Sequence, residues 1–357
     1  MVWRAGEPFL AYALFFQWLF ITTGFLYRQI TGFFPDPSIE GDLDRAVLLS
    51  LIGLFCLAAG IRLSLWYFSS RPRSPRDKLL LQHRPYDVRK VFWFVTITTL
   101  LGWQVRLVPM AFWFNGAQII SNLLAFPSIL FLVLLLAVIQ RQHGYGYAAT
   151  ASLLVWIPSL GSHMSAFSGI FFVLLVALAC EWRPWSNSLR KRLLNRWVIT
   201  AGAALSFLLL IMAVLWCGGM KSVWRPKVLK GEVSGSVLSK AHAFGLTASE
   251  VIPTVDLETA ILSLSQRMSS GIGYFGCVLQ RVPTVMPHEN GKLTMRALNH
   301  IVKPRFLFPE KPNLGSDSFL VRQYAGKSAA GLEQGTSIGL GYMGEFYIDF
   351  GFPLMFV

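Results

Sequence analysis

Charged residues are scarce in this chain of 357 residues, at 14% of the sequence, whereas hydrophobic residues make up 54%. Soluble globular proteins usually contain about 25% charged residues, so the composition excludes an ordinary soluble protein. It also excludes a disordered chain, because disorder requires low hydrophobicity. Acidic residues are the scarcer kind: 18 Asp and Glu stand against 32 Lys and Arg, which gives a formal net charge of +14.

Several chemical motifs are also missing. The four cysteines include no Cys-x-x-Cys pair, so neither a metal cluster nor a disulfide framework is indicated. The sequence has no glycine-rich phosphate loop, which argues against ATP-driven work. Three histidines that we place outside the membrane, His163, His288 and His300, lack metal-ligand spacing. We therefore predict no metal site and no cofactor.

Long apolar runs are what the sequence has instead. A spanning helix needs about 20 apolar residues, and seven runs approach or exceed that length, with an eighth starting at Tyr342. The predicted fold class is therefore all-α, a polytopic transmembrane bundle of about seven or eight spans. The seven runs are Pro8–Tyr27, Arg45–Phe68, Val91–Val105 (with a kinked or interfacial extension to Phe114), Gln118–Ile139, Tyr145–Leu160 (alternatively re-entrant), Met164–Cys180 and Trp197–Cys217.

The distribution of basic residues predicts the orientation. Segments 69–90 and 181–196 are rich in Lys and Arg, whereas segment 28–44, between the first two apolar runs, carries Asp36, Glu40, Asp42 and Asp44. Cytoplasmic loops of membrane proteins are enriched in Lys and Arg. We therefore expect a cytoplasmic N-terminus and an outward-facing segment 28–44, and the basic charge needs no nucleic acid to explain it.

This topology divides the chain into three parts. Residues 1–217 form the predicted transmembrane region, 218–341 a large extracytoplasmic loop, and 342–357 the start of a further, incomplete span. The loop holds fourteen Lys and Arg against eight Asp and Glu. A long outward segment with that excess suits an anionic substrate near the outer membrane surface.

The loop contains recognisable elements. Apolar residues recur at three- and four-residue spacing over Asp256–Gln280, which predicts an amphipathic helix, with Thr254 as a plausible N-cap. A second short helix is predicted over Lys292–Val302. The three prolines of Pro304–Pro312 favour an extended course.

The order of motifs in this part of the chain resembles a known family. An Arg-bearing helix and a Val-Pro stretch are followed by Pro-Arg-x-Leu-Phe-Pro-x-Lys-Pro, by Tyr324-Ala325-Gly326, by Thr-Ser-Ile-Gly-Leu and by Gly-Glu-x-Tyr-x-Asp-Phe-Gly. Over Leu257–Gly351 this order is similar to that of the oligosaccharide repeat-unit polymerases (O-antigen polymerase family). Members usually have more than ten spans, so we expect this chain to be a C-terminally truncated product.

The resemblance implies a glycosyltransferase of the bacterial inner membrane that acts in polysaccharide biosynthesis, on lipopolysaccharide O-antigen or exopolysaccharide. Such an enzyme joins repeat units carried on undecaprenyl diphosphate at the periplasmic face. A lipid bilayer, a chain-length regulator and a flippase are the implied partners. Three alternatives remain open: an O-antigen ligase-type enzyme, a lipid-linked oligosaccharide flippase or other transporter, and a sensor or scaffold with an outer domain. We find no internal repeat of the kind that transporters show.

The implied reaction indicates which basic residues to consider. A diphosphate leaving group needs cationic stabilisation, which the planar fork of arginine provides. Arg305 is the predicted catalytic arginine. The other basic candidates, for substrate binding, are Arg267, Arg281, Arg322, Lys311 and Arg106. The alternative is a solvated basic face, or side chains that reach toward lipid headgroups.

Two acids complete the predicted site. Glu345 and Asp349 are four residues apart and therefore share one helix face. Glu345 is the predicted catalytic base or hydroxyl acceptor, and Asp349 a predicted substrate contact. In the alternative interpretation, one of them pairs with an arginine or faces water at the membrane interface.

Overall fold

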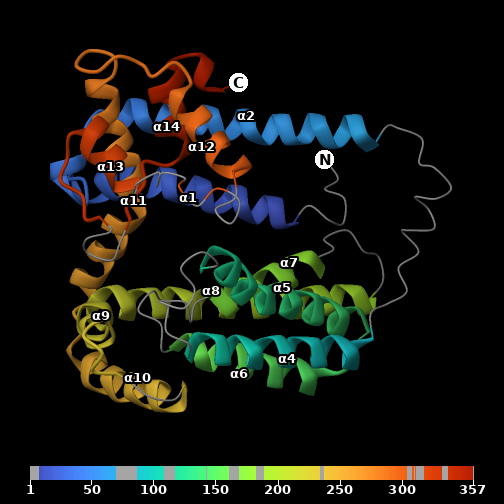
Figure 1. Ribbon diagram of the computed structural model, residues 1–357. Coiled ribbons are helices and arrows are strands. Elements are labelled where there is room, and N and C mark those ends of the chain that lie inside the picture. Colours follow the sequence, from blue (N-terminus) through green and yellow to red (C-terminus); the bar gives the residue numbers. More distant parts are fainter. Residues whose placement is uncertain are drawn as a thin grey trace. The chain divides into compact units, whose positions relative to one another are not determined.

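A computed structural model describes residues 8–69, 87–107, 117–141, 143–160, 169–181, 189–233, 237–303, 308, 310, 317–331 and 337–356 (Figure 1). Every regular element in this part of the chain is helical, so the all-α prediction is confirmed. The α-helices are α1 (Pro8–Thr31), α2 (Leu43–Ser69), α4 (Val88–Leu107), α5 (Ala117–Arg141), α6 (Tyr145–Leu160), α7 (Gly169–Glu181), α8 (Leu189–Leu215), α9 (Lys221–Leu229), α10 (Val237–Val251), α11 (Leu257–Arg281), α12 (Lys292–Val302), α13 (Asp317–Leu320) and α14 (Tyr342–Phe350).

All seven predicted apolar runs coincide with helices, namely α1, α2 and α4–α8. Within the described residues, two helical stretches are long and apolar enough to cross a membrane, Leu43–Ser64 and Ile199–Val228. Shorter apolar helices occur at Pro127–Ile139 and Tyr145–Ile157. The bundle of seven or eight spans therefore remains a prediction.

The last predicted span boundary, at Cys217, falls close to a real bend. The helical chain of α8 continues through a wider π-helical turn, Trp216–Met220, into α9. The turn is kinked at Gly219, which has non-helical backbone angles. Trp224 of α9 is fully buried and makes an edge-to-face contact with Phe244 of α10.

The helices pack as two compact units, which are described separately. One unit comprises residues 1–12 and 73–261, and the other residues 13–72 and 262–357. This division differs from the predicted domains, whose boundaries at 217/218 and 341/342 follow membrane topology. Packing thus groups α1 and α2 with the C-terminal helices, although 189 residues lie between Pro72 and Leu262 along the chain.

The first unit has a core of helices α4–α7. Phe131 and Leu134 of α5 pack with Val88 and Val95 of α4, and all four side chains are almost completely buried. Gly144, which has a positive φ of 88°, makes the turn before α6, where a Cβ would come within 2.8 Å of Val88.

Helix α11 organises the second unit, where it lies across α1 and α2 (Figure 1). Small side chains on α11 allow close approach: a Cβ on Gly273 would lie 2.8 Å from the carbonyl oxygen of Ile39. The segment between α1 and α2 therefore packs directly on α11. The amide of Gln266 donates to the carbonyl of Pro35 (2.9 Å), and the N–H of Asp42 donates to the carbonyl of Gly276 (3.1 Å).

The predicted loop helices are present with small differences. Helix α12 has the predicted bounds, Lys292–Val302, and α11 begins and ends one residue later than predicted. The prediction of Thr254 as N-cap is wrong. Asp256 caps α11 by accepting from the N–H of Thr259 (2.9 Å), whereas the Thr254 hydroxyl donates to the carbonyl of Val251 (2.8 Å).

Helix α14 differs from the predicted start of a span. It has nine residues and ends at Gly351, whose φ of 64° suits glycine. The next residues turn through Phe352-Pro353 into a short 3₁₀ helix, Leu354–Phe356. At 1.5 Å per residue, α14 is about 13 Å long and is too short to cross the hydrocarbon core. Glu345 and Asp349 therefore lie outside any spanning helix.

Candidate functional site

The structure describes five of the eight predicted site residues in full. Arg305 and Lys311 lie outside the described residues. Arg106 is on α4, in the first unit, and its side chain is also outside the described part. The remaining five belong to the second unit: Arg267, Arg281, Arg322, Glu345 and Asp349.

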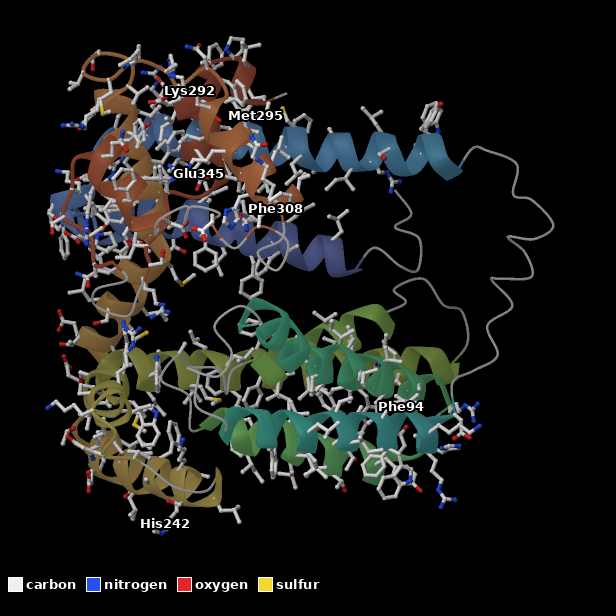
Figure 2. The ribbon with its side chains drawn as sticks, viewed as in Figure 1. Phe94, His242, Lys292, Met295, Phe308 and Glu345 are labelled. Atoms are coloured by element: carbon white, nitrogen blue, oxygen red, sulfur yellow. The ribbon has the colours of Figure 1, made fainter. Side chains whose placement is uncertain are left out.

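Glu345 lies in the first turn of α14, beside α12 (Figure 2). Its side chain is half-buried, and its carboxylate takes no hydrogen bond and no ion pair from the part of the chain that the structure describes. Burial raises the pKa of Glu345, and the nearby carboxylates of Asp317 and Asp349 raise it further. Such a group holds its proton at a higher pH than an ordinary glutamate does.

Asp317, in α13, lies near Glu345 because the residues just before α14 bond to α13. The N–H of Asp317 donates to the hydroxyl of Ser337 (3.1 Å). The hydroxyl of Ser318 donates to the carbonyl of Ala330 (2.5 Å) and accepts from the N–H of Ile338 (2.8 Å). These bonds hold Ser337 and Ile338, which precede α14, against Asp317 and Ser318 of α13.

Asp349 has a different role from its neighbour on α14. Its side chain is only 1% exposed. Its two oxygens accept from the N–H groups of Leu293 (2.9 Å) and Thr294 (2.7 Å) and from the Thr294 hydroxyl (2.6 Å). Leu293 and Thr294 are in the first turn of α12, where N–H groups lack helical partners. Asp349 therefore caps α12, and its carboxylate is already occupied by the protein.

Arg281 ends α11 and packs against the Tyr-Ala-Gly motif. A Cβ on Gly326 would lie 2.7, 2.8 and 2.9 Å from Nη1, Cζ and Nε of Arg281, so the guanidinium presents its face to this glycine. Gly326 also has a φ of 66°, which favours glycine. The Nε of Arg281 is buried without a hydrogen-bond partner among the described residues.

The tyrosine of the same motif is tied to the loop after α11. The Tyr324 hydroxyl donates to Glu289 (2.8 Å), which also faces Lys292 at 3.4 Å. Burial and this hydrogen bond raise the pKa of Tyr324. His288 contacts the carbonyl oxygen of Tyr347 through Nδ1 (3.0 Å). Within the described residues, the Val-Pro stretch and the Tyr-Ala-Gly motif thus pack near α14.

The other two arginines do not converge on Glu345. Arg322 directs Nε and Nη2 at one acceptor, the carbonyl of Ala329 (2.8 and 2.5 Å), so its fork stabilises a turn. Arg267 is exposed on α11. Sequence reasoning did not single out Asp317 or Glu289; the Tyr-Ala-Gly motif next to Asp317 was the available signal.

The described residues contain no group of three or more His, Cys, Asp or Glu side chains that could hold a metal ion. Comparison with family profiles, with curated proteins and with solved structures found no match. The resemblance noted from the motifs therefore remains a prediction, and the function is argued from the site alone.

Proposed function

We propose that the chain is a membrane glycosyltransferase that polymerises oligosaccharide repeat units carried on a polyprenyl diphosphate, at the outer face of the bacterial inner membrane. The observation that carries this proposal is Glu345: a half-buried carboxylate with a raised pKa and no cationic partner in the described part of the chain. Perturbed acids of this kind suit proton transfer.

In the proposed reaction, the hydroxyl oxygen of the acceptor sugar forms a bond to the anomeric carbon of the donor. The bond from that carbon to the diphosphate breaks, and the polyprenyl diphosphate leaves with the electron pair. Glu345 accepts the hydroxyl proton. The ionised form of Glu345 is the base, and because its pKa is raised, it is a stronger base than an ordinary glutamate.

Arg281 is the described residue best placed to contact the diphosphate. Its guanidinium is held against Gly326, and its buried Nε has no partner among the described residues. Arginine recognises phosphate oxygens through two parallel N–H bonds. Arg305 and Lys311 remain proposed contributors from the proline-rich segment, whereas the fork of Arg322 already holds a carbonyl.

A second observation supports a shared side of the membrane for two segments. The same count of basic loops assigns segments 28–44 and 218–341 to the outer face, and Pro35 and Asp42 of the first pack against α11 of the second. Two segments in contact must lie on the same side of a membrane. The basic site and the acidic segment therefore share one face.

Polymer formation in proteoliposomes that contain a polyprenyl-diphosphate-linked repeat unit tests the proposal. We expect Glu345→Gln to lower polymer formation about 10²–10⁴-fold, the usual scale for loss of a general base. Glu258→Gln, at an exposed position on α11, is the matched control and should be active. Arg281→Lys and Arg305→Lys should also lose most polymer, because lysine keeps the charge but lacks the fork.

Three results would refute parts of the proposal. Unchanged polymer from Glu345→Gln would remove Glu345 from the reaction. Near-normal polymer from Arg305→Ala would assign Arg305 to a solvated face, and near-normal polymer from Arg281→Ala would leave Arg281 only its packing against Gly326. Transfer of a single glycan to a different acceptor, without polymer, would favour the ligase-type alternative.

A further inference from the structure

Helix α12 is anchored at one end and exposed along most of its length. Its first turn is held by Asp349, and Leu293 packs against the core of the second unit. Beyond that turn no residue of α12 is buried. Figure 2 labels Lys292 and Met295 on this helix, which packs against α14, the helix that carries Glu345.

The exposed side of α12 is strongly apolar. At 100° per residue, an arc that is apolar except for Thr294 in the first turn runs from Leu293 through Ile301 and Leu298 to Met295. Within it the exposed fractions are 58% for Met295, 50% for Leu298, 76% for Ile301 and 74% for Val302. An exposed apolar face of this kind is costly in water and indicates a binding surface.

The opposite side of the same helix is cationic. Lys292, Arg296, His300 and Lys303 lie in the remaining arc with Asn299, and no acidic residue occurs between positions 292 and 303. Lys292 is 76% exposed even though it faces Glu289. A helix with one apolar face and one basic face is the form that lies in the headgroup region of anionic membranes.

Two other features of the second unit favour a position of α12 near lipid. The second unit contains Leu43–Ser64 of α2, which is long and apolar enough to cross a membrane. Phe350 of α14 lies beside the start of α12, since a Cβ on Gly291 would be 3.2 Å from its ring, and it is 37% exposed. Apolar area thus continues from α12 onto α14.

We infer that α12 lies in the outer membrane interface, with its apolar face toward the acyl chains and its basic face toward anionic headgroups. The inference needs α2 to hold the chain in a membrane, but it does not depend on glycosyl transfer. Through Asp349 and α14, it would place Glu345 close to the lipid surface, where a lipid-linked substrate resides.

Fluorescence quenching of the full chain in proteoliposomes containing phosphatidylglycerol tests this inference. In a background with the four native cysteines replaced, Ile301→Cys and Asn299→Cys are each labelled with a small fluorophore. Both positions lie near the C-terminal end of α12 but on opposite arcs, so Asn299 is the matched control. A nitroxide on the lipid acyl chain should quench position 301 several-fold more than position 299, and aqueous iodide should show the reverse order.

Two outcomes would overturn the inference. Iodide quenching at position 301 equal to that at position 299 would show that the apolar face is in water. Protection of position 301 from both quenchers would show that protein, such as a second copy of the chain, covers it. Polymer formation measured on the same vesicles is a separate readout, so failure of the proposed function would not be mistaken for failure of this inference.

Discussion

At the scale of single residues, two acids on one helix face have opposite environments. Asp349 is surrounded by N–H and O–H donors, whereas Glu345 is near other carboxylates and has no donor among the described residues. Sequence could predict that the two share a face, because this follows from their spacing. It could not predict their roles, because these depend on the first turn of α12, which begins more than fifty residues earlier.

The raised pKa of Glu345 predicts a pH-dependent stability. The folded chain binds this proton more tightly than the unfolded chain, so the contribution of Glu345 is fully present below its unfolded pKa and is lost as pH rises through its folded pKa. Glu345→Gln avoids that loss. We expect the Tm of the variant, measured in detergent, to exceed that of the parent increasingly as pH rises from acidic to neutral. A lower Tm at every pH would show instead that Glu345 holds a cation.

Removal of the Asp349 carboxylate should destabilise α12. Gly291, at the N-cap position, has no side chain to satisfy the first turn, so Asp349→Ala would leave the N–H groups of Leu293 and Thr294 without their acceptor. We expect a loss of about 2 kcal/mol in the free energy of unfolding, the upper range for an N-cap. Trypsin should also cleave after Arg296 faster. Asp349→Asn keeps one acceptor and should be milder; equal stability of all three proteins would contradict the capping role.

At the scale of elements, helix bounds were predictable where a glycine or a proline interrupts a periodic apolar pattern. Helix α12 is flanked by Gly291 and by Pro304, and its bounds were predicted correctly. The end of α14 was not predicted, because Gly351, which ends the helix, lies inside an apolar run that we interpreted as the start of one span. Thr254 failed as a cap because Asp256, two residues on, is adjacent to the helix.

The contact between α11 and the segment before α2 depends on Gly41. A Cβ there would lie 2.3 Å from the backbone N of Cys277, which cannot move independently of α11. We expect Gly41→Ala to cost about 4 kcal/mol, at the severe end for single substitutions. Gly32→Ala is the control: its φ of 82° is also positive, but nothing lies within 4 Å of its Cβ, so about 1 kcal/mol should be lost. Similar losses in chemical denaturation would refute the tight contact.

At the scale of the whole molecule, packing joins segments that the sequence keeps far apart. The apolar runs indicate helices one by one, but nothing in them indicates that α1 and α2 pack with residues 262–357. That packing depends on shape, for example on Gly41 fitting against Gly276 and Gly24 against Phe34. The charge pattern predicts that segments 28–44 and 218–341 both face outward, and this orientation remains a prediction.

This packing makes a topology prediction that is stricter than the charge rule alone. Ser38 and Lys292 are both exposed, and both belong to the unit built around α11. Cysteines at positions 38 and 292 should therefore react with a membrane-impermeant maleimide from the same side, outside the cell. Arg76→Cys follows the candidate span Leu43–Ser64 and should react only after the membrane is opened. Labelling of all three from outside would show that α2 does not cross. Labelling of 38 and 292 from opposite sides would contradict the packing of α11 on segment 34–42, and with it the shared outer face on which the proposed site depends.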